Sequence, residues 1–390
     1  CAVESASDEA LLSEAKKEIL RYAEGTLPAV YDPFVGGGAI PVEAQRLGLK
    51  AESSDLNPVA VMITKLVADV PARFSDTVSV HPQQEMKLDI PLPGAKGYAE
   101  DVQFYGEWML AEAKNRIGYL YPQVTSPETG ADLEISAWIW ARTIKCPNPS
   151  CGCEIPLSSS YDLAKKKGSE AWVEPYVDDG AVRFRIHREP NTSGKGKPKV
   201  AQTAVFKCPV CGEITPDAYV KECGINHKIH SQLIAIVADE SRKRLYIEPT
   251  TEQETIADVK APKEVPHGAL QIFAQRFSPP SFGLTDYADL FTNRQLVFIT
   301  TMMKLAREAQ DSVEHAATDK GLPDDGISFA AGGSGALAYA EAVRIALVLT
   351  VSKLLDRCSS LCSWSSSSGG SLRNVFSRAA MPMIWDYAEG

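Results

Sequence analysis

The chain has 390 residues, of which 44% are hydrophobic and 23% charged, so it has the composition of a folded globular protein with two or three domains. Its formal net charge of −10 excludes a chain that binds nucleic acid through an overall basic surface. Residues 151–220 hold ten Lys and Arg against nine Asp and Glu, which makes this stretch the one plausible basic patch.

The first predicted elements are a helix and a strand. Residues 8–24 carry leucine and isoleucine at helical spacing. The apolar stretch 28–34 predicts a short buried strand, which a glycine-rich turn separates from a helix over 39–48.

A second strand and a second helix follow. Residues 49–55 predict the strand, and 57–70 predict the helix, with Asn57 as its N-cap. Pro58 stands in the first turn, where a missing N–H costs nothing. The alternation over 28–70 is typical of the opening of a doubly wound α/β sheet.

The centre of the chain is predicted to be mostly β structure. The Pro-rich stretch 72–98 predicts a surface loop, and 100–122 predicts a helix. Residues 133–146 predict a strand, 176–186 a hairpin around an Asp-Gly turn, and 230–249 one or two more strands.

The last third of the chain is predicted to be largely helical. A capping box at Thr292 starts one helix, and 336–356 forms the most apolar one. The longest uncharged run of the second, 345–352, is too short to cross a bilayer, so we expect a buried helix. A Ser/Gly-rich tract at 359–372 predicts a flexible loop. Nothing resembles a targeting signal, and we expect a cytoplasmic protein with no membrane partner.

The glycine-rich turn lies in the stretch YDPFVGGGAI, residues 31–40. A phosphate-binding P-loop needs a Gly-Lys-Ser/Thr ending, which is absent, and a dinucleotide site needs a third glycine where Pro41 stands. S-adenosylmethionine has no pyrophosphate and needs a close backbone approach, which Gly36 and Gly38 allow. An acid at the end of the second strand, here Asp55, would then bind the ribose hydroxyls. We therefore predict an S-adenosylmethionine site.

The same residues carry a family resemblance. DPFVGGGAIPVEA resembles the D-P-F-x-G-x-G cofactor motif of amino-methylating DNA methyltransferases, and SSDLNPVA resembles their ribose-binding motif. The resemblance implies that Asp32, Pro33 and Phe34 line the cofactor pocket. It also implies that Asp55 binds the ribose hydroxyls and that Asn57 shapes a turn near the adenine ring.

From about residue 10 to its end, the chain resembles one subgroup, the predicted adenine-specific DNA methylases that contain a zinc ribbon. The segments that carry this resemblance are DPFVGGGAIPVEAQRLGL, SDLNPVAV, AEDVQFYGEWML, WARTIKCPNPSCGCEIPL, GLTDYADLFTNRQL, AYAEAVRIALVL and MPMIWDYAE. The resemblance implies methyl transfer to adenine N6 in DNA, within restriction or phage-defence systems, with DNA and other defence proteins as partners. Cytosine N4 stays open as the acceptor, because it is also an exocyclic amine.

The resemblance further implies a fold and a division into parts. We expect an α/β protein with a Rossmann-like class I methyltransferase core, an inserted zinc-ribbon β subdomain and a helical C-terminal part. The core is expected to begin within 1–130, the insertion to occupy 131–250, and the mostly helical region to occupy 251–390.

An amino-methylating enzyme also needs an Asp/Asn/Ser-Pro-Pro-aromatic motif, which holds the amine and stacks on the base. The candidate here is Ser278-Pro279-Pro280, but Ser281 stands at the aromatic position, and a plain loop is the alternative. In the family this motif follows the WDYAE segment, where the chain stops, and the chain begins with Cys1. We therefore expect a fragment that binds the cofactor weakly and is inactive alone.

Five of the nine cysteines lie close together in the sequence, in CPNPSCGC and CPVCG. Without a secretion signal, this spacing favours a metal site over disulfides, and four thiolates satisfy a closed, structural zinc site. The expected ligands are Cys146, Cys151, Cys208 and Cys211. Cys153 is an alternative to Cys151, and a set of buried free cysteines is the alternative to a metal site.

Two other functions stay open. The chain could be a non-catalytic zinc-ribbon DNA-binding or scaffold component of a defence system, with a decayed glycine loop. It could instead be a nicotinamide-dependent oxidoreductase, although Pro41 and the Asp-Pro-Phe arm argue against that cofactor. The basic hairpin beside the cysteines could contact DNA phosphates or be purely structural.

Overall fold

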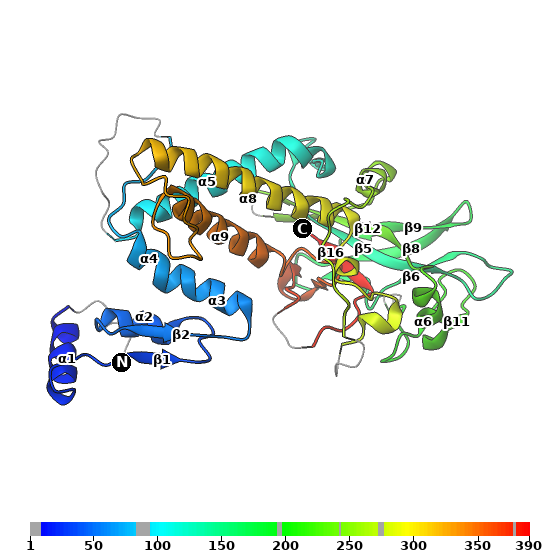
Figure 1. The fold of residues 1–390 in the computed structure, drawn as a ribbon. Helices are drawn as coiled ribbons and strands as arrows, with labels where there is room; N and C mark the ends of the chain where they lie inside the picture. The colour runs from blue at the N-terminus through cyan, green and yellow to red at the C-terminus, as the bar shows by residue number, and fades with distance from the viewer. Residues whose placement is uncertain (1–8, 83–93, 193–196, 242, 272–276, 377–379) are drawn as a thin grey trace. The chain divides into compact units, whose positions relative to one another are not determined.

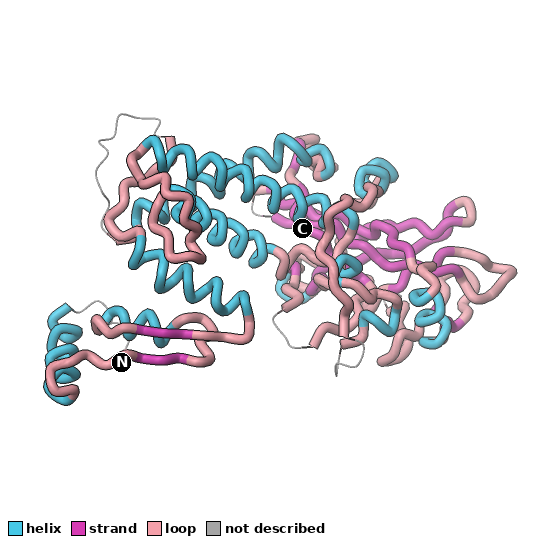
Figure 2. Tube along the Cα trace, in the orientation of Figure 1, coloured by secondary structure: helices cyan, strands magenta, loops and turns pink. Residues whose placement is uncertain are grey.

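The structure is a computed structural model that describes residues 9–82, 94–192, 197–241, 243–271, 277–376 and 380–390. The chain divides into two compact units, unit 1 with residues 1–112 and 303–350, and unit 2 with residues 113–302 and 351–390. Each unit is assembled from two separate stretches of chain. The sequence analysis expected three consecutive parts, 1–130, 131–250 and 251–390, and that division stays a prediction. Figure 2 shows that most of the strands belong to unit 2.

Unit 1 begins with α1 (Glu9–Tyr22) and continues into a β–α–β unit. Strand β1 (Val30–Asp32) pairs in parallel with β2 (Ala51–Ser53), and α2 (Ala39–Arg46) connects them (Figure 1). The alternation expected for this part of the chain is confirmed. Within the described residues this sheet has two strands, so the larger Rossmann-like core stays a prediction.

Helix α3 (Pro58–Thr64) follows β2 and starts as its sequence predicts. The side chain of Asn57 accepts the N–H of Val59 at 3.0 Å, and Pro58 occupies the first turn. The helix continues through a π-helical turn and α4. These two short elements span Lys65–Asp69 and Val70–Arg73.

Three long helices complete the described part of unit 1. They are α5 (Lys96–Ile117), α8 (Asn293–Asp319) and α9 (Ala336–Leu354), which contribute residues 96–112, 303–319 and 336–350. The buried helix expected at 336–356 is confirmed as α9. The expected loop at 72–98 is shorter than predicted because α5 starts at Lys96, and residues 83–93 lie outside the described residues.

A buried carboxylate joins α5 to α9. Asp101 is fully buried and accepts the hydroxyl of Tyr339 at 2.6 Å and that of Ser79 at 2.7 Å. It also accepts the backbone N–H groups of Val80 and His81 at 2.9 Å. A buried carboxylate is costly unless its oxygens accept hydrogen bonds. These bonds therefore hold residues 79–81, which precede α5, against α5.

Unit 2 is built on an antiparallel sheet with the order β13-β12-β5-β16, in which β6 also pairs with β5. The bounds of these strands are β5 (Ile135–Lys145), β6 (Glu154–Leu157), β12 (His230–Glu240), β13 (Lys243–Ile247) and β16 (Asp386–Glu389). One edge of β5 pairs with β12, and the other is shared by β16 and β6. The expected strand at 133–146 and the pair of strands at 230–249 are confirmed.

A second sheet packs on one face of the first. Its strands are β7 (Asp162–Ala164), β8 (Ala171–Asp178) and β9 (Ala181–His187). Alternate residues of β5, such as Ile139 and Ala141, meet Val173 and Phe184 in one apolar cluster. The expected hairpin is confirmed. Asp179 and Gly180 both have positive φ, 49° and 76°, as a tight two-residue turn requires.

Shorter elements complete unit 2. The strands are β3 (Val124–Thr125), β4 (Asp132–Leu133), β10 (Phe206–Lys207), β11 (Ile214–Thr215), β14 (Trp364–Ser365) and β15 (Ser371–Leu372). The helices are α6 (Asp217–Ile225), α7 (Thr251–Ala257) and 3₁₀ turns at Gly118–Leu120, Pro279–Phe282, Tyr287–Leu290 and Ser367–Gly369.

One expectation for the C-terminal part needs correction. The tract 359–372 was predicted to be a flexible loop, but Ser359 and Cys362 are fully buried and β14 pairs with β15. Serine and glycine are typical of flexible loops, but their small side chains also let this tract pack closely against the rest of unit 2. The region 251–390, predicted to be mostly helical, contains α7, α8 and α9 and also the four-residue strand β16, and its place in the division of the chain stays a prediction.

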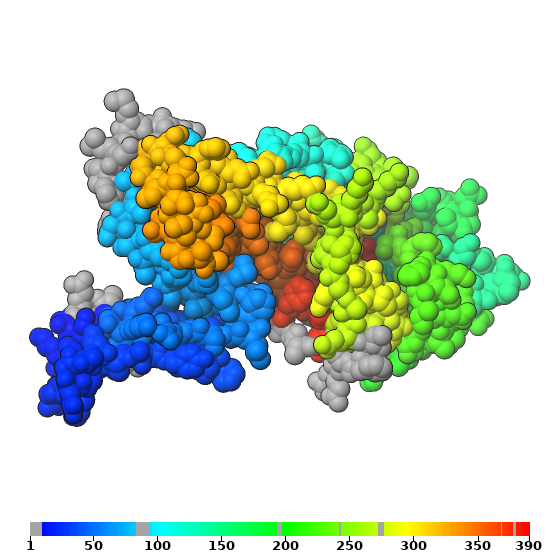
Figure 3. Space-filling view, viewed as in Figure 1, coloured from blue at the N-terminus to red at the C-terminus, as the bar shows by residue number. Residues whose placement is uncertain are grey.

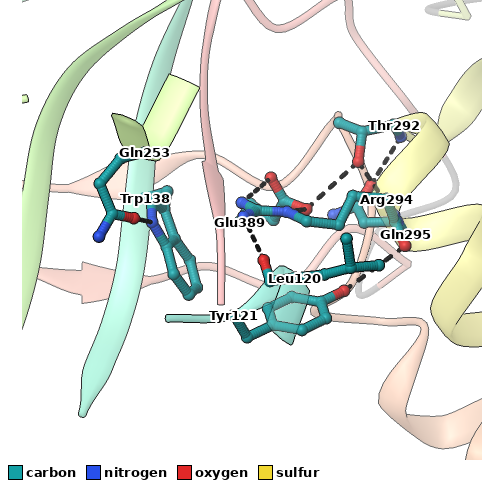
Figure 4. A network of polar contacts seen from close by, with 8 residues as sticks. All are labelled: Leu120, Tyr121, Trp138, Gln253, Thr292, Arg294, Gln295 and Glu389. Atoms are coloured by element: carbon teal, nitrogen blue, oxygen red, sulfur yellow. Dashed lines mark hydrogen bonds and ion pairs between the residues drawn. The ribbon is translucent and has the colours of Figure 1, made fainter. Parts of the chain in front are cut away.

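An ion pair fastens β16 to the start of α8 (Figure 4). Arg294 donates from Nε and Nη2 to the two carboxylate oxygens of Glu389 at 2.9 and 2.8 Å, and from Nη1 to the carbonyl of Leu120 at 3.0 Å. Both side chains are almost completely buried. The guanidinium also lies 4.5 Å from the ring centre of Trp138. The expected capping box of Thr292 and Gln295 is confirmed beside it.

We predict that Glu389→Gln lowers the free energy of unfolding by about 3 kcal/mol or more, because it leaves the buried guanidinium of Arg294 without a counter-charge. The matched control is Glu128→Gln, which breaks the exposed pair between Glu128 and Arg188 and should cost less than about 0.5 kcal/mol. Urea unfolding of both variants measures the difference. Equal losses of unfolding free energy in the two variants would show that the buried pair stabilises the fold no more than the exposed pair does.

A second prediction concerns Asp386. Burial raises the pKa of this carboxyl from 3.8 to about 6. The folded chain therefore holds the proton more tightly than the unfolded chain, so this residue favours folding at low pH and loses that effect as the pH rises through 6. Between about pH 4 and pH 8, the wild type should lose about 2 kcal/mol of unfolding free energy relative to Asp386→Asn. Denaturant unfolding at both pH values tests this, and parallel pH profiles would contradict it.

Candidate functional site

The glycine loop follows β1, and the predicted ribose-binding residues follow β2. Because the two strands are parallel, both segments lie at the same edge of the sheet. The backbone joins them there, with the N–H of Ser54 bonded to the carbonyl of Asp32 and that of Val35 to Ser54. The structure thus brings together the residues predicted to bind a cofactor, namely Asp32, Pro33, Phe34, Gly36, Gly38, Asp55 and Asn57.

Asp55 links the two segments. Its Oδ2 accepts the N–H of Gly36 at 2.9 Å, and its Oδ1 accepts the N–H of Asn57 at 2.8 Å. These bonds, that of Asn57 first, hold the pKa of Asp55 below its usual value, so the group is a carboxylate at neutral pH. Each carboxylate oxygen has a second lone pair, so Asp55 can accept further hydrogen bonds from a ligand's hydroxyls.

The Asp-Pro-Phe arm has one buried and one exposed member. Asp32 is buried, and its Oδ1 accepts the N–H of Phe34 at 3.1 Å, which shapes the turn. The side chain of Phe34 is 80% exposed, and that of Leu56, beside Asp55, is 96% exposed. This segment belongs to the part of unit 1 drawn in blue in Figure 3. Two apolar side chains are therefore accessible to a ligand at the loop.

The two glycines predicted to approach the cofactor differ in their surroundings. Gly36 has a φ of 53°, and a Cβ there would meet only the carbonyl oxygen of Phe34, at 3.9 Å, so this glycine serves the turn and leaves room for a ligand. Gly38 has a φ of 82°, and a Cβ there would lie 2.9 Å from the side chain of Val67 and 3.3 Å from the Cα of Thr64. Gly38 therefore permits close packing of the loop against the helix that starts with α3.

The candidate catalytic residues lie in unit 2. Ser278 precedes the 3₁₀ turn Pro279–Phe282, in which Pro279 and Pro280 are buried. The Oγ of Ser278 accepts the N–H of Met383 at 2.7 Å. These contacts give the tripeptide a structural part in unit 2, and its catalytic role stays a prediction.

Four cysteine sulfurs form the clearest cluster of metal-binding atoms in the described residues. Those of Cys146, Cys151, Cys208 and Cys211 lie within 4.8 Å of one another and could hold a metal ion. The sulfurs of Cys146 and Cys211 are 3.6 Å apart, and those of Cys151 and Cys208 are 3.9 Å apart. Sulfurs bound tetrahedrally at about 2.3 Å from a metal are about 3.8 Å apart, so these spacings fit one ion.

Two similar turns present these sulfurs. After β5, the carbonyl of Asn148 accepts the N–H groups of Cys151 and Gly152. After β10, the carbonyl of Cys208 accepts the N–H of Gly212. Gly152 and Gly212 have φ values of 57° and 78°, so each turn closes through a left-handed glycine that directly follows a cysteine.

Cys153 lies beside the cluster as a fifth cysteine. It is buried, and its sulfur is 3.4 Å from those of Cys151 and Cys208. The backbone N–H of Cys153 lowers the pKa of the Cys151 thiol to about 7, whereas burial raises that of Cys153 itself. The group of four sulfurs that lie within 4.8 Å of one another includes Cys151 and not Cys153, which favours Cys151 as the fourth ligand.

Sequence reasoning did not single out Arg142 or Trp140, which line a cavity in unit 2. The available signal was the segment WIWAR, in which period two places Trp138, Trp140 and Arg142 on one face of β5. The pattern does not tell whether an arginine on such a face meets solvent, a carboxylate or a ligand.

Comparisons of the chain with protein-family models, with curated proteins and with solved structures give no match. The resemblance to zinc-ribbon DNA methylases therefore rests on the sequence motifs and stays a prediction. Among the helices of the described residues, none has the length and apolar character needed to cross a membrane.

We predict that the purified chain holds about one metal ion, measured by elemental analysis after gel filtration. Cys211→Ser should remove most of it, and Cys211 is exposed, so this change disturbs packing least. Cys153→Ser is the matched control and should retain the metal, since Cys153 lies outside the group of four. Loss of metal in the Cys153 variant alone would contradict this ligand set.

Proposed function

We propose that this chain belongs to a DNA methyltransferase that transfers a methyl group from S-adenosylmethionine to an exocyclic amine of a DNA base. Adenine N6 is the acceptor that the motif resemblance favours, and restriction or phage defence is the setting. The observation that carries the proposal is the ionised Asp55 beside an open glycine turn, at the common edge of two parallel strands.

The chemistry of this edge fits the cofactor. The free lone pairs of Asp55 suit the two ribose hydroxyls, and the open space at Gly36 allows a ligand to approach the backbone. The exposed side chains of Phe34 and Leu56 offer apolar surface for an adenine ring. S-adenosylmethionine would supply a reactive methyl group on a sulfonium, so the protein's own task is to position it.

We further propose that the metal held by the four cysteines is zinc. An all-thiolate, four-coordinate set is typical of zinc in structural sites, and it leaves no open position for a substrate. The ion would tie the turn after β5 to the turn after β10, and would compensate the negative charge of four clustered thiolates. Its part in the protein would thus be to stabilise unit 2.

The hairpin of β8 and β9 is the proposed contact for DNA in unit 2. Arg183 and Arg185 are exposed on β9, and the guanidinium of Arg185 lies 4.9 Å from the ring centre of Tyr176. Arginine beside an aromatic ring suits phosphate and base contacts. Since the chain as a whole is acidic, such binding would be local and would weaken with added salt.

The proposal predicts that S-adenosylmethionine binds the purified chain in isothermal titration calorimetry. Asp55→Asn removes the charge that faces the ribose and should weaken binding at least about tenfold, or about 1.4 kcal/mol. Glu52→Gln is the matched control, because Glu52 is an exposed acid on the same strand, paired with Lys50, and should bind as the wild type does. No binding at millimolar S-adenosylmethionine, or binding of NAD⁺ in its place, would overturn the proposal.

A further inference from the structure

A cavity of about 760 Å³ lies over the sheet of unit 2. Trp140 and Arg142 of β5 and Tyr387 and Glu389 of β16 line it, and these residues share one face of two paired strands. Residues of β12, of α7 and of the segment before α8 line the rest. This volume is within the range of sites for small organic ligands.

Two buried arginines adjoin this face, and they differ in whether a carboxylate among the described residues balances their charge. Arg294 has its carboxylate partner in Glu389 (Figure 4). Arg142 is only 7% exposed, and its donors meet the carbonyls of Ile384 and Ser360 and the hydroxyl of Ser360. Its guanidinium also lies 5.2 Å from the ring centre of Tyr387. Among the described residues, no carboxylate forms an ion pair with Arg142.

An unpaired buried charge is costly, and arginine keeps its charge at neutral pH. Burial lowers the pKa of Arg142, which is a sign of that cost. The hydrogen bonds of Arg142 use Nε and Nη2, so Nη1 has no acceptor in the described residues. Arg142 therefore offers a cation and two free N–H groups to a ligand in the cavity.

The acidic groups around the cavity are already engaged, with one exception. Glu254 accepts the N–H of Leu233 at 3.0 Å, and Asp289 accepts the N–H groups of the turn that precedes it. Glu389 is neutralised by Arg294. Asp258 is the acid for which the structure gives no partner of this kind. Arg142 is the one arginine or lysine among the described residues that line the cavity, so the walls offer a single position for an anionic group.

Aromatic side chains provide the remaining specificity. The rings of Trp140 and Tyr387 are nearly parallel, with an angle of 13° and centres 6.5 Å apart, and both side chains contribute to the cavity wall. A ring of a ligand can pack against the parts of these side chains that face the cavity.

We propose that this cavity binds a small molecule that carries one carboxylate or phosphate group and a flat ring. The oxyanion is bound by Arg142, and the ring lies against the parts of Trp140 and Tyr387 that face the cavity. A guanidinium binds either oxyanion through two N–H groups, so both remain in the ligand class. This site lies wholly within unit 2 and does not depend on the cofactor loop of unit 1.

The test uses phenyl phosphate and benzoate as probes of the full chain, with benzyl alcohol as the uncharged control, in ligand-detected NMR titrations. Both anions should bind with dissociation constants in the millimolar range or below, and benzyl alcohol at least about tenfold more weakly. The probe that binds more tightly shows whether the cavity prefers a phosphate or a carboxylate. Failure of both to bind at about 20 mM, or equal binding of benzyl alcohol, would overturn the proposal.

Substitutions at Arg142 show whether the probe binds in this cavity. Arg142→Met should weaken the binding of both anions at least about tenfold, and the matched control Arg21→Met, at an exposed arginine of α1 that pairs with Glu18, should leave their binding unchanged. Should Arg142→Met not fold, Arg142→Lys decides. It keeps the charge, loses the paired N–H geometry, and should weaken binding about threefold or more while circular dichroism stays that of the wild type. Wild-type affinity in a folded Arg142 variant would contradict the assignment.

Discussion

The pairing of strand β5 is the constraint on which unit 2 depends. One of its edges carries β12 and the other carries both β16 and β6, so strands from distant parts of the sequence meet on it. One of its faces builds the apolar core with the second sheet, and the other presents Trp138, Trp140 and Arg142. Its C-terminal end leads to Cys146, which places the first metal ligand relative to this sheet.

Each candidate site uses a different physical device to hold its reactive groups. In unit 1, Asp55 closes the loop through backbone N–H groups and stays ionised, so the group that shapes the turn is also the group offered to a ligand. In unit 2, two glycine-closed turns aim four sulfurs at one point. In the cavity, Arg142 is buried without an ion-pair partner among the described residues, and we propose that this charge binds the anionic group of a ligand.

Local features of the fold were predictable from sequence, and long-range ones were not. The cap at Asn57 and the Asp-Gly turn depend on a few adjacent residues, whose hydrogen bonds and φ angles follow from their chemistry. Strand β16 was missed because its four residues carry no strand pattern of their own and gain their structure by pairing with β5. Spacing favoured Cys151 but left Cys153 open as an alternative, since only the fold decides which sulfur reaches the other three.

The central claim is that S-adenosylmethionine binds at the edge of β1 and β2. The most direct test follows the backbone amide signals of the chain by NMR as S-adenosylmethionine is added. The account predicts that the signals of Gly36, Phe34 and Asn57 shift first and saturate together, while those of the cysteine turns stay fixed. Shifts confined to other regions, with the amides of this loop unmoved, would contradict it.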